Sequence, residues 1–106
     1  MIWVKYQTRE DAFVSLEITG HADFREKGED VVCAAASLTG TGLLNAIDEM
    51  EPEACELIKE DNRIYVKVLH DSEQLQTILT ASYHIFKTLE YKFRMYVRVR
   101  KTEVKS

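Results

Sequence analysis

Residues 1–20, MIWVKYQTREDAFVSLEITG, contain the clearest structural pattern in the chain. Apolar side chains alternate with polar ones over residues 1–8 and again over residues 14–19, with the polar turn 8–11 between them. A period of two residues is typical of strands that bury one face, and two such runs around a short turn predict a hairpin. The side chains expected to face the core are Ile2, Val4, Tyr6, Val14, Leu16 and Ile18.

A helix is predicted next, over residues 31–50, after the polar loop 21–29. Asp30 is a candidate N-cap of this helix, because a carboxylate accepts hydrogen bonds from the N–H groups of a first turn. Gly40 and Gly42 would each cost about 1 kcal/mol relative to alanine in an exposed helix. They therefore indicate either close packing of the helix on a sheet or a break near residue 40.

The second half of the chain is predicted to contain two strands, a helix and a last strand. Residues 54–60 and 63–69 flank the turn Asp61–Asn62, and residues 93–100 alternate as a last strand. A further helix is capped by Asp71 or Ser72. Its apolar stripe, at helical spacing, consists of Leu75, Ile78, Leu79, Ser82, Ile85, Phe86 and Leu89.

The order of elements is therefore ββαββαβ. It predicts an α+β fold, a two-layer sandwich in which both helices pack on one face of one sheet. No linker or repeat divides residues 1–106, so we expect a single domain, with residues 102–106 fraying at its end.

Composition limits the class of protein. The chain has 106 residues, 45% of them hydrophobic, and its formal charge is −4. This content argues against a disordered chain, and the acidity disfavours nucleic-acid binding through overall charge. Two cysteines cannot form a disulfide framework, and residues 1–8 are too short for a secretory leader. We expect a cytoplasmic protein in a reducing compartment.

The chemistry is concentrated in residues 20–37, GHADFREKGEDVVCAAAS. His21 follows a strand, and Cys33 is expected in the first turn of a helix. A helix N-terminus and a neighbouring imidazolium both favour a thiolate, and the N–H groups of the first turn can face the oxygen of a tetrahedral intermediate. Ser37 lies one helical turn after Cys33, on the same face. The pattern is compatible with a cysteine nucleophile and a histidine base.

Structural interpretations of the same residues are also available. A single cysteine on a helix is usually a small buried side chain, and a histidine after a strand is usually solvated. Asp30 is either the cap or a group that orients His21. Cys55 has no partner at metal or redox spacing and is expected to be structural. We expect no metal and no cofactor.

The motif itself resembles a known family. GHA, followed by a loop that ends in GEDVVCAAAS, closely resembles the signature of the ribosomal-processing cysteine proteases of Firmicutes and related bacteria. The matching positions are Gly20, His21, Ala22, Gly28, Asp30, Val32, Cys33, Ala34 and Ser37.

The resemblance implies a cysteine endopeptidase with Cys33 as nucleophile and His21 as general base, and with Asp30 and Ser37 as candidate supporting residues. It also implies a homodimer, and as substrate a large-subunit ribosomal protein from which a short N-terminal extension is removed.

Two alternatives remain open at the level of sequence. The last predicted strand and its surroundings contain a basic strip: Lys92, Arg94, Arg98, Arg100, Lys101 and Lys105. This strip is either a charged face that discourages aggregation or the contact surface of a non-enzymatic, ribosome- or assembly-associated binding protein. A redox-sensing thiol protein would instead require a reversible Cys33–Cys55 disulfide.

Overall fold

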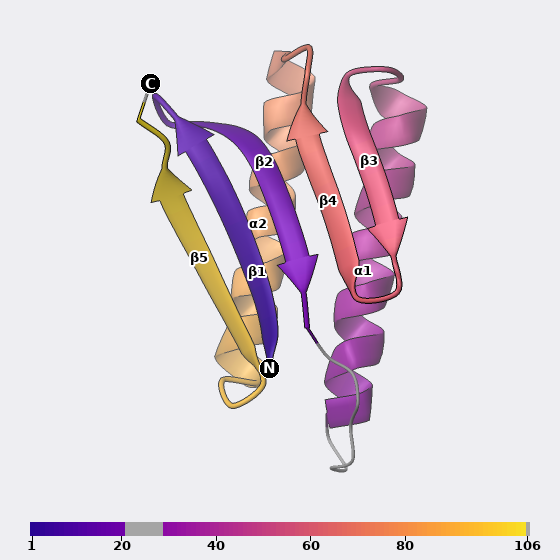
Figure 1. Cartoon of the computed structure of the whole chain (residues 1–106), viewed down its shortest axis with the longest axis vertical. Helices are drawn as coiled ribbons and strands as arrows, with labels where there is room; N and C mark the ends of the chain where they lie inside the picture. The colour runs from indigo at the N-terminus through magenta and orange to yellow at the C-terminus, as the bar shows by residue number, and fades with distance from the viewer. Residues whose placement is uncertain (21–28, 106) are drawn as a thin grey trace.

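A computed structural model describes residues 1–20 and 29–105, of which residues 29 and 30 are described by their backbone alone. Five strands form one sheet in the order β3-β4-β2-β1-β5, and both helices cover the same face of it (Figure 1). This is the predicted two-layer α+β fold with the predicted ββαββαβ order. The elements are β1 (Ile2–Arg9), β2 (Ala12–Thr19), α1 (Glu29–Met50), β3 (Cys55–Glu60), β4 (Arg63–Val68), α2 (Glu73–Lys92) and β5 (Val97–Glu103).

The hairpin of β1 and β2 contains an irregularity that the alternation of residue types conceals. Gln7 pairs with Ser15 but Thr8 pairs with Phe13, so Val14 is the extra residue of a bulge. The bulge shifts the phase of β2, and Phe13 is buried whereas Val14 is only half-buried. The expectation that Val14 faces the core is therefore wrong. The other five predicted core residues of the hairpin are buried.

Helix α1 is continuous through both glycines. A Cβ atom on Gly40 would lie 2.7 Å from Cδ1 of Ile64 and 3.1 Å from Cδ1 of Ile18, so an alanine at this position requires the ends of these two side chains to move. A Cβ atom on Gly42 would meet no atom of the described residues within 4 Å. Gly40 thus reflects close packing on the sheet, and the alternative of a break near residue 40 is wrong.

The same helix has a second property that the alternation patterns did not reveal. Its segment Val31–Met50 is long and apolar enough to cross a membrane, judged by length and composition alone. Such a segment is weak evidence for a span, because the core helix of a globular protein passes the same test. Here Val32, Ala36, Leu43 and Ile47 are buried in the core shared with the sheet.

Helix α2 begins as predicted. Ser72 is its N-cap, and the hydroxyl oxygen of Ser72 accepts a hydrogen bond from the N–H of Leu75 at 3.0 Å. Ser82 is buried within the stripe, and its hydroxyl lies 2.8 Å from that of the buried Tyr6. Ile85 is 53% exposed, so its predicted burial is wrong: it lies one residue before the buried Phe86 and therefore about 100° away around the helix.

Strand β5 starts later and ends later than predicted. Phe93 caps the C-terminus of α2, and the strand begins at Val97. Its pairing with β1 is parallel and continues to Thr102 and Glu103, which pair with Gln7 and Thr8. The expectation that Thr102 and Glu103 fray is therefore wrong, because β1 supplies hydrogen-bonding partners up to that point.

Candidate functional site

Gly20 ends β2 in a conformation that favours glycine. Its φ angle is +97°, and an added Cβ atom would collide with the carbonyl oxygen of Met1. The first residue of the motif is thus explained by backbone geometry, since residues with a side chain rarely adopt a positive φ angle. His21 follows directly, but His21, Gly28 and the predicted loop between them lie outside the described residues.

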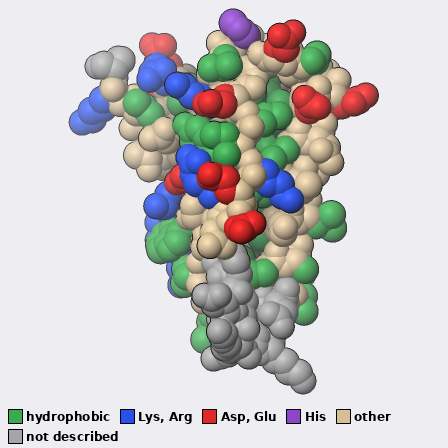
Figure 2. Space-filling view, turned by 45° about the vertical axis from the view of Figure 1, so that its right-hand side comes forward, with side chains coloured by type: hydrophobic (Ala, Val, Ile, Leu, Met, Phe, Trp, Pro, Cys, Tyr) green, Lys and Arg blue, Asp and Glu red, His purple; other side chains and the backbone are tan. Residues whose placement is uncertain are grey.

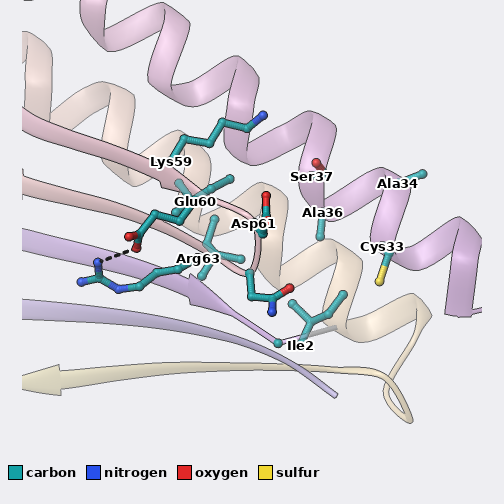
Figure 3. A pocket seen from close by; sticks show the side chains of 13 residues that line it. Ile2, Cys33, Ala34, Ala36, Ser37, Lys59, Glu60, Asp61 and Arg63 are labelled. Carbon is teal, nitrogen blue, oxygen red and sulfur yellow. Dashed lines mark hydrogen bonds and ion pairs between the residues drawn. The ribbon is translucent and has the colours of Figure 1, made fainter. Parts of the chain in front are cut away.

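A cavity of about 520 Å³ opens beside Gly20, between α1 and the edge of the sheet where β2 ends (Figure 3). Cys33 and Ser37 line it from α1, and Ile2, Ile18 and Ile64 form apolar parts of its wall. Pockets of this size are typical of sites for small ligands or short peptide segments. The two described side chains of the motif that can do chemistry therefore meet at one cavity.

Cys33 is the fifth residue of α1 and is half-buried. The helix begins at Glu29, so Cys33 lies at the start of the second turn, and its predicted place in the first turn is wrong. Helical side chains point back toward the N-terminus, which puts the thiol over the first turn. Figure 3 shows the sulfur leaving α1 toward the strands, on the side where Ile2 lies.

The two candidate supporting residues have different positions. Ser37 is exposed and lines the same cavity, one turn after Cys33. Asp30 lies inside the first turn of α1, and the prediction that it is the N-cap is wrong because a cap residue precedes the helix. The side chain of Asp30 is outside the described part of the chain.

Sequence reasoning missed one wall of the cavity, the turn between β3 and β4. Residues 59–64 line it, and Asp61 and Asn62 form the turn itself. The turn reaches this place because β4 pairs antiparallel with β2, so that Arg63 lies opposite Thr19. The predicted turn at Asp61–Asn62 was a usable signal, but its neighbour in the sheet depends on strand order.

Arg63 is held in place at this wall by its neighbours. Its Nε donates to Oε2 of Glu17 at 2.7 Å, its Nη1 lies 3.4 Å from Oε1 of Glu60, and its guanidinium lies 4.6 Å from the ring centre of Tyr65. These contacts make the β3–β4 wall polar and ordered, in contrast to the apolar wall formed by the isoleucines.

Cys55 occupies a different environment. It begins β3, at the opposite end of a six-residue strand from the wall residue Glu60, roughly 17 Å away along the strand. Burial, followed by the nearby carboxylates of Asp71 and Glu51, raises the pKa of the Cys55 thiol to about 11. A protonated thiol packed against the core fits the structural role predicted for Cys55. The separation also argues against a Cys33–Cys55 disulfide in this fold.

Other candidate ligands lie away from the cavity. His70 and His84 are exposed, and neither lines it. Within residues 1–20 and 31–105, no three His, Cys, Asp or Glu side chains are grouped so that they could hold a metal ion.

The chain is similar to proteins with a known activity. A family model described as cysteine protease Prp matches residues 1–98. The ribosomal processing cysteine protease Prp of Staphylococcus aureus (strain Mu50 / ATCC 700699) is 30% identical over 83 residues, which are 76% of this chain and 78% of that protein. The protein of the same name from Bacillus subtilis (strain 168) is 39% identical over 41 residues, 39% of this chain and 37% of that protein.

Solved structures agree with the family match. The S. aureus protease Prp in complex with a substrate peptide superposes with a TM-score of 0.87 at 25% identity, covering 95% of this chain and 99% of that one. The same protease with a covalently linked product peptide gives 0.84 at 26% identity and the same coverage. SMU.848 from Streptococcus mutans, at 23% identity and a TM-score of 0.82 (98% and 96% coverage), shares the fold.

Proposed function

We propose, from the premise that this chain belongs to the cysteine protease Prp family, that it removes a short N-terminal extension from a large-subunit ribosomal protein. The chain is a cysteine protease of ribosomal processing; its substrate and its catalytic pair are the parts we propose. The observation that carries the proposal is the position of Cys33, over the first turn of α1 and on the wall of the cavity of about 520 Å³. Membership of a protease family excludes the non-enzymatic alternative and leaves the basic strip to be explained separately.

The proposed reaction uses Cys33 and His21. The Cys33 thiolate attacks the carbonyl carbon of the scissile bond, and a C–S bond forms while the carbonyl oxygen becomes an oxyanion facing the first-turn N–H groups of α1. The C–N bond then breaks, and the imidazolium of His21 gives its proton to the leaving amine. His21 next takes a proton from water, whose oxygen attacks the thioester, and the acid product leaves Cys33.

The cavity supports a peptide substrate on two grounds. Its apolar wall offers Ile2, Ile18 and Ile64 to an apolar side chain of the extension. Its opposite wall offers Asn62 in the β3–β4 turn, whose side-chain amide can pair with a peptide backbone. An extended segment lying between α1 and the β3–β4 turn would pass Cys33 on its way.

We also propose supporting residues, a homodimer and a cytoplasmic location. Ser37 is placed to bond a substrate amide, and Asp30 to orient His21. Val31 and Leu38 are 63% and 76% exposed on α1, seven residues apart and so on one helical face, which supports burial against a second copy. A thiol nucleophile requires a reducing compartment, and neither a cofactor nor nucleic acid is needed for cleavage.

The test is cleavage of a synthetic peptide that spans the extension junction of the ribosomal protein. Native protein, Cys33→Ala and the matched control Cys55→Ala are compared, and the cut is located by mass. We expect Cys33→Ala to lower kcat/KM by at least about a thousandfold, as loss of a nucleophile does, and Cys55→Ala to stay within about threefold of native. Cleavage by Cys33→Ala at the native rate would overturn the assignment.

The roles proposed for His21, Asp30 and Ser37 need separate measurements. His21→Ala should remove cleavage as completely as Cys33→Ala does, because residues of one catalytic unit act together. If Asp30 orients His21, Asp30→Asn should lower kcat by about tenfold and change its pH profile. If Ser37 bonds the substrate, Ser37→Ala should raise KM and leave that profile unchanged.

A further inference from the structure

The charges of this acidic protein are divided unevenly along the chain. Residues 87–105 contain seven Lys and Arg against two Asp and Glu, whereas the rest of the chain contains seven against sixteen. Acidic side chains gather where α1 ends, at the top of the molecule in Figure 2. The C-terminal part of α2 and all of β5 fall within residues 87–105. The overall charge of −4 therefore conceals a local basic region.

That region contains a hollow of its own. A cavity of about 430 Å³ is lined by Lys87, Glu90, Tyr91, Arg94 and Arg98. It lies where α2 ends and β5 begins, at the same end of the molecule as the start of α1 (Figure 1). We call these five residues the basic groove.

The only acidic residue lining the groove is already engaged. Oε1 of Glu90 accepts from Nζ of Lys87 at 2.9 Å, and its Oε2 accepts from the N–H of Val99 on the open edge of β5 at 2.8 Å. The hydrogen bond to Glu90 raises the pKa of Lys87, and nearby Arg100 opposes that rise. Arg94 and Arg98 take part in none of the ion pairs found among the described residues. Both guanidinium groups are therefore available to pair with a bound anion.

Aromatic rings lie beside the arginines of this region. Tyr91 is 72% exposed, and the guanidinium of Arg94 lies 5.1 Å from its ring centre. On the sheet next to the groove, the guanidinium of Arg100 lies 5.3 Å from the ring of Trp3, which pairs with Arg98 across β1 and β5. Exposed rings beside arginines are the usual platform for unstacked bases, and arginine forks suit phosphate oxygens.

We propose that the basic groove binds single-stranded RNA, with Arg94 and Arg98 on successive phosphates and Tyr91 stacked on a base. Two features favour RNA over an acidic peptide. The two groove cations that form no ion pair among the described residues are both arginines, and Tyr91, the most exposed aromatic ring of the described residues, lies within the groove.

The groove and the proteolytic cavity are neighbours. Ile2 lines the cavity and pairs with Val97, and the next residue of β5, Arg98, lines the groove. Adjacent strands lie about 4.8 Å apart. A ribosomal protein held on RNA could therefore present its extension to Cys33 while the RNA occupies the groove; this consequence rests on the proposed function, whereas RNA binding itself does not.

The test is fluorescence anisotropy with an unstructured, labelled 12-nucleotide RNA between 50 and 300 mM salt. Arg94→Gln/Arg98→Gln is compared with Arg9→Gln/Lys67→Gln, a control that changes the net charge equally at exposed sites outside the groove. We expect the groove variant to raise Kd at least tenfold and to reduce the slope of log K against log salt by about 1.4, the value for two phosphate contacts on a single strand. The control should change Kd less than twofold. Tyr91→Ala should weaken the binding of single-stranded RNA by about tenfold and leave the binding of an RNA duplex unchanged.

Several outcomes would overturn the proposal: equal losses in both double variants, an unchanged salt slope, no RNA binding by native protein at 50 mM salt, or tighter binding to polyglutamate than to RNA. Cleavage of the junction peptide serves as the control for folding, because the groove variant should cut it at the native rate. If native protein binds RNA but does not cut that peptide, the proposed substrate is contradicted and RNA binding by the groove is supported. If it cuts the peptide but does not bind RNA, only the proposal of RNA binding is contradicted.

Discussion

Cys33 and Cys55 carry the same side chain in different environments. Cys33 lies over the first turn of a helix and beside a cavity, whereas Cys55 is surrounded by apolar atoms and by the carboxylates of Asp71 and Glu51. Both the low polarity and the negative charge disfavour a Cys55 thiolate. The distinction made from sequence, between a reactive and a structural cysteine, therefore has a physical basis at Cys55.

The two thiols should differ in alkylation. At pH 7.5 the pKa of about 11 makes the Cys55 thiolate about a hundredfold rarer than that of a thiol with the ordinary value of 9.0. We expect iodoacetamide to modify Cys33 at least about a hundredfold faster than Cys55, with loss of cleavage in step with Cys33 labelling, as measured by peptide mass mapping. Raising the pH toward 11 should increase the rate at which Cys55 is alkylated. Equal rates at pH 7.5 would contradict this account, and His21→Ala serves as a control by slowing Cys33 alone.

At the scale of elements, α1 performs two tasks. Its buried face packs against the sheet, closely enough at Gly40 that a Cβ atom would displace the ends of Ile64 and Ile18, and its first turns carry Cys33 and Ser37 to the cavity. A glycine that looks like a helix breaker is in this helix a packing residue.

The two helical glycines allow a matched comparison. Gly40→Ala and Gly42→Ala gain the same helix propensity, up to about 1 kcal/mol, but only the first forces Ile64 and Ile18 to move. We expect Gly42→Ala to raise the free energy of unfolding and Gly40→Ala to be less stable than Gly42→Ala by about 1–3 kcal/mol, the usual cost of overfilling a core. Urea unfolding of both variants measures the difference. Equal stabilities would show that α1 does not pack tightly at residue 40.

At the scale of the whole molecule, charge is distributed unevenly. Basic side chains line the groove where α2 ends and β5 begins, acidic side chains gather where α1 ends, and Val31 and Leu38 are exposed apolar side chains on one face of α1. The first region is the proposed RNA site, and the face of α1 with Val31 and Leu38 is the proposed interface with a second copy of the chain. The cavity with Cys33 lies close to two of these regions.

The proposed homodimer predicts a specific mutational effect. Leu38 is 76% exposed on α1, and Ile85 is 53% exposed on α2. If α1 forms the interface, Leu38→Gln should raise the dimer dissociation constant at least tenfold, whereas Ile85→Gln should leave it unchanged. Sedimentation velocity over a concentration series measures both. Dissociation by Ile85→Gln alone would move the interface to α2, and a monomeric native protein would exclude the dimer.

Local patterns predicted most of the fold. Alternation over two residues and spacing over three or four residues identify strands and helices from neighbouring side chains alone, which is why all seven elements were predicted. Two of the errors lie where a local pattern continues across a boundary. Val14 keeps the alternation through a bulge, and residues 93–96 keep it through the end of α2 and the turn before β5.

The sequence alone also contained the chemical motif, because residue type and order specify which groups are available: Cys33, His21, and a glycine at position 20. The surroundings of the motif required the tertiary structure. Strand order β3-β4-β2-β1-β5 brings the turn at Asp61 beside Gly20, and the parallel pairing of β1 with β5 brings the basic groove beside the cavity. Both contacts join residues far apart in the chain, and such pairings depend on how the whole core packs rather than on any short segment.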